Sequence, residues 1–337
     1  MNYQELKKKA DGQMGKCFNC NVCDGRACKN TVPGPGSKGS GTVATKNFDA
    51  WKNVLLEMDT IVDGGDIDTS IEFFGKKFSI PVFAGPVGAI AMHYSDKYND
   101  ISYNDILVKG CVEAGICAFT GDGIDKTINE KACEKIKEVG GLGIPTIKPW
   151  AKDIMIEKIK CAKEANAFAI ATDVDASGLP FIKNQNPPAG RKNISELREI
   201  INEAKVPYII KGIMNKKAAL KAVEAGAKGI VVSNHGGRVL DSVPSTMEVL
   251  PEIVEAVKGK CVIVVDGGIR TGQDVFKAIA LGADACIIAR PFVNAIFAAE
   301  KEGIKSYVDM IKTELEDTMS MCGARKISEI SREMVRF

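Results

Sequence analysis

The fold is decided by residues 231–292, where three segments share one pattern: VVSNHGGRVLD at 231–241, CVIVVDGGIR at 261–270 and ACIIARPF at 285–292. Each segment is a short apolar run that ends in polar or glycine-rich residues, as expected of a buried strand followed by a functional loop. The carboxyl ends of parallel strands meet at one rim of a (β/α)8 barrel, and the active sites of such enzymes lie there. The pattern therefore predicts that polar side chains converge on that rim: His235, Arg238, Asp266, Arg270 and Arg290.

The rest of the chain repeats this alternation of apolar runs and amphipathic stretches. The segments NKKAALKAVEAGAKG and TGQDVFKAIALGADA space apolar residues by three and four and then reach glycine, as a helix and its C-terminus do. Eight consecutive units without a visible switch favour an α/β fold of the (β/α)8 TIM barrel type, although a doubly wound open sheet also permits the alternation. The predicted strands are residues 81–85, 116–120, 143–147, 168–172, 207–211, 229–233, 262–266 and 285–289.

Composition divides the chain into two parts. Residues 1–45 form a Cys-rich extension with a glycine- and proline-rich linker, TVPGPGSKGSGT, and the whole extension is predicted to be a loop or linker rather than a helix or strand. Residues 46–337 form the barrel, with a predicted hairpin around Gly75 that closes its bottom. The long connections at 86–105 and 173–193 are expected to enclose a substrate at the functional face.

The charge balance restricts the partners of this chain of 337 residues. Its 45 Lys and Arg residues nearly cancel 43 Asp and Glu residues, so no net field favours nucleic acid or a membrane surface. The first residues contain no apolar segment of signal-peptide length, and no later apolar run has the length of a membrane span. The sequence predicts a cytoplasmic protein with a small-molecule substrate.

The motifs SNHGGRVLD, DGGIRTGQDVFKAIALGAD and ARPF together resemble the FMN-dependent 2-hydroxy-acid oxidases and dehydrogenases. The resemblance implies FMN as cofactor and a homo-oligomer, with a tetramer as the expected state. Glycines 267 and 268 permit close approach of the backbone to a phosphate, and Arg270 and Arg290 can form forked hydrogen bonds to it. The FMN-binding positions implied are Pro86, Val87, Gly88, Thr120, Lys211, Ser233, Asp266, Gly267, Gly268, Arg270, Ala289 and Arg290.

The same resemblance assigns the catalytic roles. His235 would remove the hydroxyl proton of a 2-hydroxy acid while the α-hydrogen leaves as hydride to flavin N5, and only one other histidine is present in the chain. Asp175 would orient this imidazole, with Asp173 as the alternative because residues two apart on an extended chain point the same way. Arg238 would clamp the substrate carboxylate, and Lys211 would stabilise negative charge on the reduced flavin.

The chain departs from the family pattern in its substrate pocket. The family adds two tyrosines and a second arginine there, whereas the corresponding segments read VPGPGSKGSG, IPTIKPW and SGLPFIKN. Neither the second half of the carboxylate clamp nor the positioning hydroxyl is supplied at those positions. The candidates to replace them are Lys148, Trp150, Lys183, Tyr94, Tyr98 and Tyr103.

Four cysteines, Cys17, Cys20, Cys23 and Cys28, form a C-x2-C-x2-C-x4-C motif in the extension. Close thiolate spacing of this kind is typical of an iron–sulfur cluster, and zinc or a metal-free thiol group are the alternatives. A cluster close to the flavin would let electrons leave one at a time toward an acceptor protein. That route fits a dehydrogenase better than an oxidase.

Two other functions are compatible with parts of this pattern. Type 2 isopentenyl diphosphate isomerase also uses FMN on a related barrel, but the HGGR-x-LD arrangement speaks against it. An electron-transfer flavoprotein without turnover would have no use for His235, Arg238 and Asp175 together. The sequence therefore favours an FMN-dependent oxidoreductase that acts on a 2-hydroxy acid.

Overall fold

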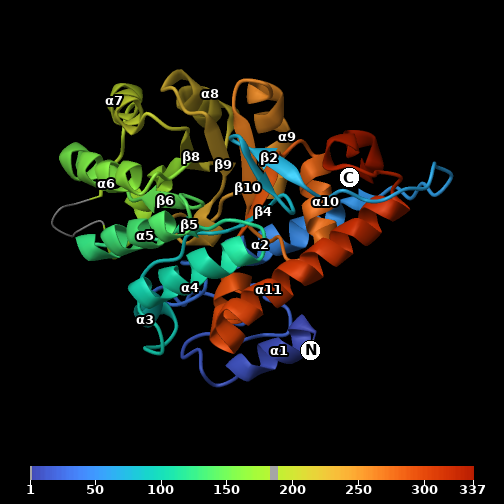
Figure 1. Cartoon of the computed structure of the whole chain (residues 1–337), viewed down its shortest axis with the longest axis horizontal. Helices are drawn as coiled ribbons and strands as arrows, with labels where there is room; N and C mark the ends of the chain where they lie inside the picture. The colour runs from blue at the N-terminus through green and yellow to red at the C-terminus, as the bar shows by residue number, and fades with distance from the viewer. Residues whose placement is uncertain (1, 183–188) are drawn as a thin grey trace.

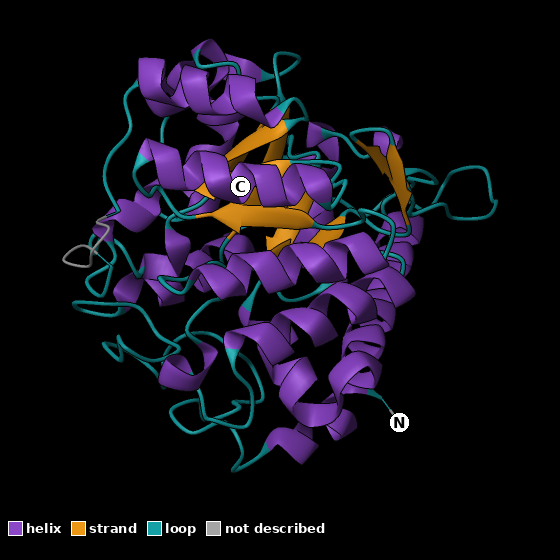
Figure 2. Cartoon of the chain, turned by 60° about the vertical axis from the view of Figure 1, so that its left-hand side comes forward, coloured by secondary structure: helices purple, strands orange, loops and turns teal. Residues whose placement is uncertain are grey.

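A closed barrel of eight parallel strands forms the centre of the molecule. The computed structural model describes residues 2–182 and 189–337. The strand order is β4-β11-β10-β9-β8-β7-β6-β5, and a parallel bridge between Ala84 and Ala118 joins the two ends of the sheet. Helices surround these strands (Figures 1 and 2). The barrel predicted from the sequence is confirmed, and the open sheet is wrong because this bridge joins its edges.

The barrel strands are β4 Val82–Ala84, β5 Phe119–Thr120, β6 Ile144–Ile147, β7 Ile170–Asp173, β8 Tyr208–Ile213, β9 Gly229–Val232, β10 Val262–Asp266 and β11 Ala285–Ile288. The helices are α1 Tyr3–Lys7, α2 Thr42–Ala50, α3 Ile90–His93, α4 Asp100–Glu113, α5 Lys126–Glu138, α6 Lys152–Glu164, α7 Ile194–Ala204, α8 Lys216–Glu224, α9 Thr246–Val257, α10 Gly272–Ala280 and α11 Arg290–Met321. Every predicted strand overlaps an observed one.

Side chains of one alternating set fill the barrel interior. Since successive residues of a strand point to opposite faces, every second residue faces inward. The inward set forms one apolar cluster separate from the larger core between strands and helices. Its strand members are Phe83, Phe119, Ile144, Ala171, Ile209, Val231, Val264, Ala285 and Ile287.

An antiparallel hairpin closes the amino-terminal end of the barrel. Strands β2 (Ile71–Phe73) and β3 (Lys76–Phe78) pair around Gly75, whose φ is +75°. Phe73 and Phe78 belong to the interior cluster, and their rings lie 4.7 and 5.1 Å from that of Phe83. The predicted hairpin is confirmed, so chemistry is left to the opposite rim.

The extension is more ordered than its composition indicates. Asn2 and Glu5 form a capping box that starts α1, which packs beside α11 (Figure 1). The phenol of Tyr3 donates to the carbonyl of Pro291 over 3.3 Å. The prediction of a loop throughout the extension is therefore wrong for α1 and for the start of α2, whereas the glycine- and proline-rich stretch before Thr42 has no regular helix or strand.

No helix in residues 2–182 or 189–337 has both the length and the apolar character that crossing a membrane requires.

Candidate active site

Polar side chains occupy the carboxyl-terminal rim because the inward alternation continues past the apolar layers. Four polar residues each lie two positions beyond an inward-facing member of the cluster, at or near the carboxyl ends of β7 to β10: Asp173, Lys211, Ser233 and Asp266. Asp173, Lys211 and Ser233 are buried. The repeat of two in each strand thus brings three charged side chains and one hydroxyl from four strands to one place, as predicted for the rim.

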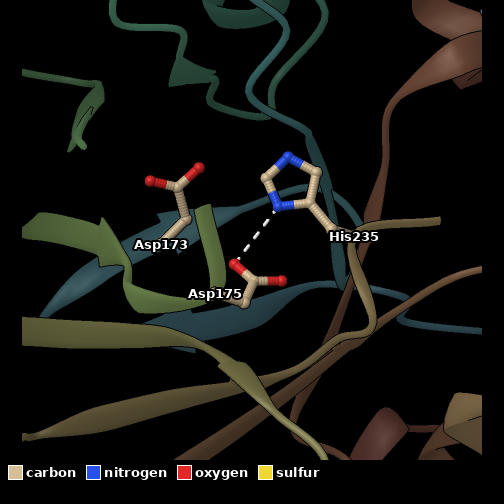
Figure 3. A group of neighbouring side chains, drawn as sticks. All are labelled: Asp173, Asp175 and His235. Carbon is tan, nitrogen blue, oxygen red and sulfur yellow. Dashed lines mark hydrogen bonds and ion pairs between the residues drawn. The ribbon is translucent and has the colours of Figure 1, made fainter. Parts of the chain in front are cut away.

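The imidazole of His235 lies against the carboxylate of Asp175. Its Nδ1 is 3.2 Å from Oδ1 of Asp175, and its Nε2 points away from this carboxylate (Figure 3). His235 has a left-handed φ of +55°, and its backbone N–H donates to the hydroxyl of Ser233 over 3.1 Å. Such a backbone costs about 1–3 kcal/mol and is found most often at functional sites.

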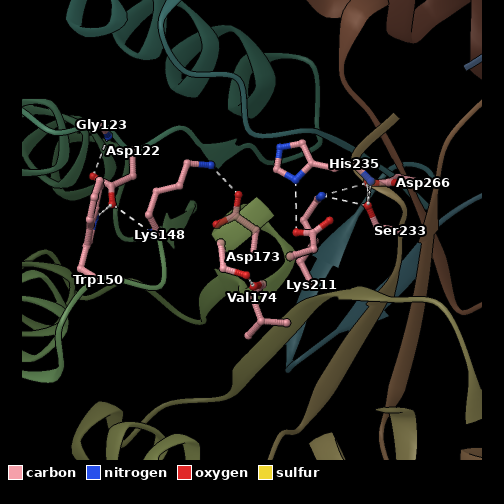
Figure 4. A network of polar contacts seen from close by, with 12 residues as sticks. Asp122, Gly123, Lys148, Trp150, Asp173, Val174, Lys211, Ser233, His235 and Asp266 are labelled. Atoms are coloured by element: carbon pink, nitrogen blue, oxygen red, sulfur yellow. Dashed lines mark hydrogen bonds and ion pairs between the residues drawn. The ribbon is translucent and has the colours of Figure 1, made fainter. Parts of the chain in front are cut away.

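Asp173 has a different partner. Its Oδ2 is 2.5 Å from Nζ of Lys148, which follows β6 (Figure 4). Although Asp173, Asp175 and His235 place one ligand atom each within 4.8 Å of one another, Lys148 and Lys211 face the same carboxylates. These two cations already compensate the negative charge of the carboxylates. Of the two aspartates, Asp175 has the geometry of the orienting residue.

Lys211 is the centre of a buried hydrogen-bond network. Its ammonium donates to the Ser233 hydroxyl over 2.9 Å, and that hydroxyl donates to Oδ2 of Asp266 over 2.8 Å (Figure 4). Burial disfavours the charged form, but Asp266, Asp175 and Asp173 outweigh this effect and raise the pKa of Lys211. The rim therefore keeps a fixed positive charge.

Arg238 extends from the loop after β9 toward the extension. Its Nη1 donates to the carbonyls of Gly34 and Gly36, each over 2.7 Å, and its Nη2 lies 3.0 Å from Nε2 of His93. Burial first, and then the neighbouring Arg238, lowers the pKa of His93 to about 3, so this ring is a neutral acceptor. A guanidinium has five N–H groups, so the Nε proton and one Nη2 proton remain for another ligand.

These groups surround one cavity with a volume of about 320 Å³, within the range of roughly 300–1,000 Å³ that is usual for ligand sites. Its wall includes the predicted residues Pro86, Val87, Gly88, Lys211, His235, Arg238, Asp266, Gly267, Gly268, Arg270, Ala289 and Arg290. Thr120 and Ser233 are buried at strand ends and are not among the lining residues.

Comparisons with known proteins show which family has a chain and a fold of this kind. Residues 35–187 and 181–337 match the family model described as FMN-dependent dehydrogenase. The chain belongs to the FMN-dependent dehydrogenase family. A peroxisomal (S)-2-hydroxyacid oxidase of Arabidopsis thaliana is 32% identical over 333 residues, which cover 86% of this chain and 87% of the relative. L-lactate dehydrogenase of Haemophilus influenzae is 30% identical, with 88% and 91% covered. A solved structure of a mandelate oxidase variant with 2-hydroxy-phenylacetamide has a TM-score of 0.80 at 26% identity, covering 99% of this chain and 97% of that one.

FMN is the cofactor of this family, and the residues around the cavity fit it. Oδ1 of Asp266, Nη1 of Arg290 and Oγ1 of Thr120 are buried and have no hydrogen-bond partner within the described residues. Buried polar atoms without partners are rare in folded proteins, and a group bound in the cavity would supply partners for Asp266 and Arg290, which line it. Arg290 can donate hydrogen bonds to a phosphate, and Asp266 can accept hydrogen bonds from hydroxyl groups. Lys211 can stabilise a ring that gains negative charge.

Glycines 267 and 268 also let the loop after β10 pack closely against helix α2, which the sequence did not show. Both have left-handed φ values, +90° and +84°. A Cβ on Gly268 would lie 2.0 Å from the carbonyl oxygen of Asn47 in α2. Asn47 in turn exchanges two side-chain hydrogen bonds of 2.8 Å with Asn234, next to His235. Helix α2 thus supports both the predicted phosphate loop and the loop that carries His235.

The candidates for the missing pocket residues fall into two groups. Tyr94 and Lys148 line the cavity. Tyr98 instead donates to Glu300, Trp150 donates to the buried carboxylate of Asp122, and Tyr103 is fully buried outside the lining set. Lys183 lies outside the described residues. His93, which the sequence reasoning missed, also lines the cavity, and its Nδ1 is buried without a partner in the described part of the chain.

The surroundings of His235 predict the pH dependence of a reaction in which this imidazole acts as the base. Burial lowers the pKa of this imidazole below its ordinary value of 6.5; Asp175 opposes the effect and Lys211 adds to it. Because only the neutral ring accepts a proton, activity should be lost on acidification and level above the pKa. We expect the acid limb of kcat/KM to have its midpoint below pH 6.5. A midpoint above 7 would show that the base is a different group.

Lys211→Met should destabilise the protein even without ligand. The variant removes the cation that faces three carboxylates and the Ser233 hydroxyl. Removing one partner of a buried charged pair costs about 3–5 kcal/mol. We expect a loss of this size in the free energy of urea unfolding at pH 7, with Lys216→Met in the exposed first turn of α8 as the control. An unchanged unfolding curve would contradict the network.

Proposed function

We propose that the chain oxidises a 2-hydroxy acid to the corresponding 2-oxo acid with FMN as cofactor. The observation that carries the proposal is the contact of Asp175 with His235, an imidazole that lines the same cavity as Lys211 and Arg238. The relatives are named for such reactions: 2-hydroxyacid oxidase, glycolate oxidase and L-lactate dehydrogenase.

His235 acts as the general base. Its Nδ1–H donates to ionised Asp175, whose pKa is lowered by His235 and Lys211 despite burial. This bond fixes the tautomer in which Nε2 is free to take the hydroxyl proton, and the carboxylate stabilises the imidazolium that results. When bound, FMN supplies the acceptor for the α-hydrogen and its electron pair.

Arg238 anchors the substrate carboxylate. The carbonyls of Gly34 and Gly36 hold one side of its guanidinium, so the remaining N–H groups are fixed in direction. Burial lowers the pKa of Arg238 only to about 10, so it stays charged at neutral pH. His93 replaces part of the role of the missing pocket residues, since it contacts Arg238 and lines the same cavity.

Arg238→Lys should weaken substrate binding more than turnover. An ammonium cannot reproduce the fork of a guanidinium, and hydrogen bonds to charged groups contribute about 1.5–3 kcal/mol. We expect KM for the hydroxy acid to rise about 10- to 100-fold with a smaller change in kcat, and the FMN content to stay constant. A KM equal to that of the parent protein would refute the anchoring role.

The reaction itself is tested with a panel of 2-hydroxy acids that differ in side chain, in the presence of an artificial electron acceptor. We expect at least one acid to yield its 2-oxo acid, identified by mass spectrometry. Isopentenyl diphosphate with reduced FMN is the control for the isomerase alternative and should yield no isomer. Isomerisation without oxo-acid formation would overturn the proposal.

A tetramer and an electron-acceptor protein are part of the same proposal. The oligomeric state rests on the resemblance alone and is tested by light scattering of the purified protein.

A further inference from the structure

We propose that Cys17, Cys20, Cys23 and Cys28 bind an iron–sulfur cluster of the [4Fe–4S] type, placed beside the flavin cavity as its one-electron outlet. The family match begins at residue 35, after the last of these cysteines. The family's shared machinery therefore does not account for them.

The four cysteines lie around one small cavity. All four are free thiols of intermediate burial, and all four line the same enclosed space together with Tyr94, Arg290 and Asn294. No regular helix or strand is present between Ala10 and Thr42. A loop that winds around a common centre with a thiol at each turn is how proteins hold such clusters.

The spread of the sulfurs favours a cluster over a single zinc ion. Zinc with bonds of about 2.3 Å to four thiolates places the sulfurs about 3.8 Å apart. Within the described residues, no three sulfurs of this motif come within 4.8 Å of one another. A [4Fe–4S] core separates its ligands further, because each thiolate binds a different iron at a corner of the core.

Positive groups surround this cavity. Lys7 is buried, and its ammonium donates to the carbonyls of Cys20 and Asn21. Nη2 of Arg270 lies 3.9 Å from Sγ of Cys23, and its Nε donates to the carbonyl of the same residue over 2.8 Å. The one acidic residue among the lining residues, Asp24, forms an ion pair with Arg26. Cations suit a cluster whose four thiolates give it net negative charge.

The loop is also held in place from outside the motif. The amide of Asn19 donates to the carbonyl of Lys7 and to Asp11, each over 2.8 Å, and its oxygen accepts from Asn294 of α11. These contacts order the loop without using a cysteine. The thiols thus remain available as ligands in a fixed frame.

The two cavities share a wall. Pro35, Tyr94 and Arg290 line both the cysteine cavity and the flavin cavity. The two spaces are therefore adjacent, and the distance for electron transfer between them is short. On the outer side, Phe18 and Val22 are 68% and 53% exposed, which leaves this face of the loop open to a partner protein.

The role as outlet rests on the proposed function. Oxidation of one 2-hydroxy acid releases two electrons and two protons. A cluster carries one electron at a time, so each turnover sends two electrons in succession to two equivalents of a one-electron carrier protein, and the protons go to water. Such an enzyme is a dehydrogenase.

The site is tested by iron, zinc and acid-labile sulfide analysis of full-length protein purified without oxygen. We expect about four iron and four sulfide per chain. Cys20→Ser should lose most of both, whereas the control Cys161→Ser, a singly placed thiol of similar burial, should retain them. Zinc alone, or no metal with intact thiols, would overturn the site.

The outlet is tested by electron paramagnetic resonance of the parent holoenzyme after anaerobic mixing with its hydroxy acid. We expect the signal of a reduced cluster to appear as the flavin is reduced. If the flavin is reduced and that signal stays absent, the outlet is refuted. If iron and sulfide are present but no hydroxy acid reduces the flavin, the proposed function fails and the cluster site stands.

Discussion

His235→Ala will still bind its yellow flavin, but substrate will reduce that flavin far more slowly. The groups facing the predicted flavin position, Lys211, Asp266 and Arg290, are untouched by the change, so FMN should stay bound. The base is gone, and general base catalysis contributes about 10²–10⁴-fold. We expect the rate constant of flavin reduction in anaerobic rapid mixing to fall by that factor at saturating substrate.

The chain offers a matched control in its other histidine. His93 is also buried and lines the same cavity, but it contacts Arg238 rather than a carboxylate. His93→Ala should therefore raise KM and change the limiting rate of reduction much less. Added imidazole should restore part of the rate in His235→Ala only. Reduction of His235→Ala at the parent rate would remove this residue from the mechanism.

Asp175→Asn will produce the second large loss. An amide in place of the carboxylate no longer accepts the Nδ1 proton firmly, so the imidazole takes the wrong tautomer and its protonated form loses a counter-charge. A change of this kind in a histidine–aspartate pair costs up to about 10⁴-fold in turnover. The measurement is again the rate of flavin reduction, together with the FMN content.

Asp173→Asn separates this effect from a general loss of charge. Asp173 lies two residues away, is fully buried, and pairs with Lys148 instead of the imidazole. Its variant should unfold at lower urea concentration while reducing the flavin much faster than Asp175→Asn. Equal rates for the two variants would mean that Asp175 has no special relation to His235.

The barrel could be predicted from the sequence because each of its strands and helices can be recognised within a short stretch of residues. Runs such as CVIVVD show the strands by their length, and glycines 226 and 282, with φ near +100°, mark the ends of α8 and α10. The strand alternation then fixes which polar residues reach the rim. For that reason Lys211 and Asp266 lie where the motifs placed them.

Contacts between distant segments could not be predicted in this way. Nothing near His93 in the sequence shows that Arg238 lies 3.0 Å from it, since 145 residues separate the two. The contact of Asn47 with Gly268 could not be predicted for the same reason. Nor could the sequence decide whether Asp173 or Asp175 contacts His235, because both come just after the same predicted strand and would point the same way on an extended chain. Short helix α1 was missed because its stability comes from a capping box and from packing on α11, and the composition around it shows neither.

The proposed reaction is tested by anaerobic titration of the purified, FMN-reconstituted protein with 2-hydroxy acids, followed by its visible spectrum. We expect a yellow protein whose oxidised flavin absorbance disappears with at least one of these acids, while the matching 2-oxo acid appears. A protein that stays colourless after reconstitution, or a bound flavin that no hydroxy acid reduces, would contradict the proposed reaction.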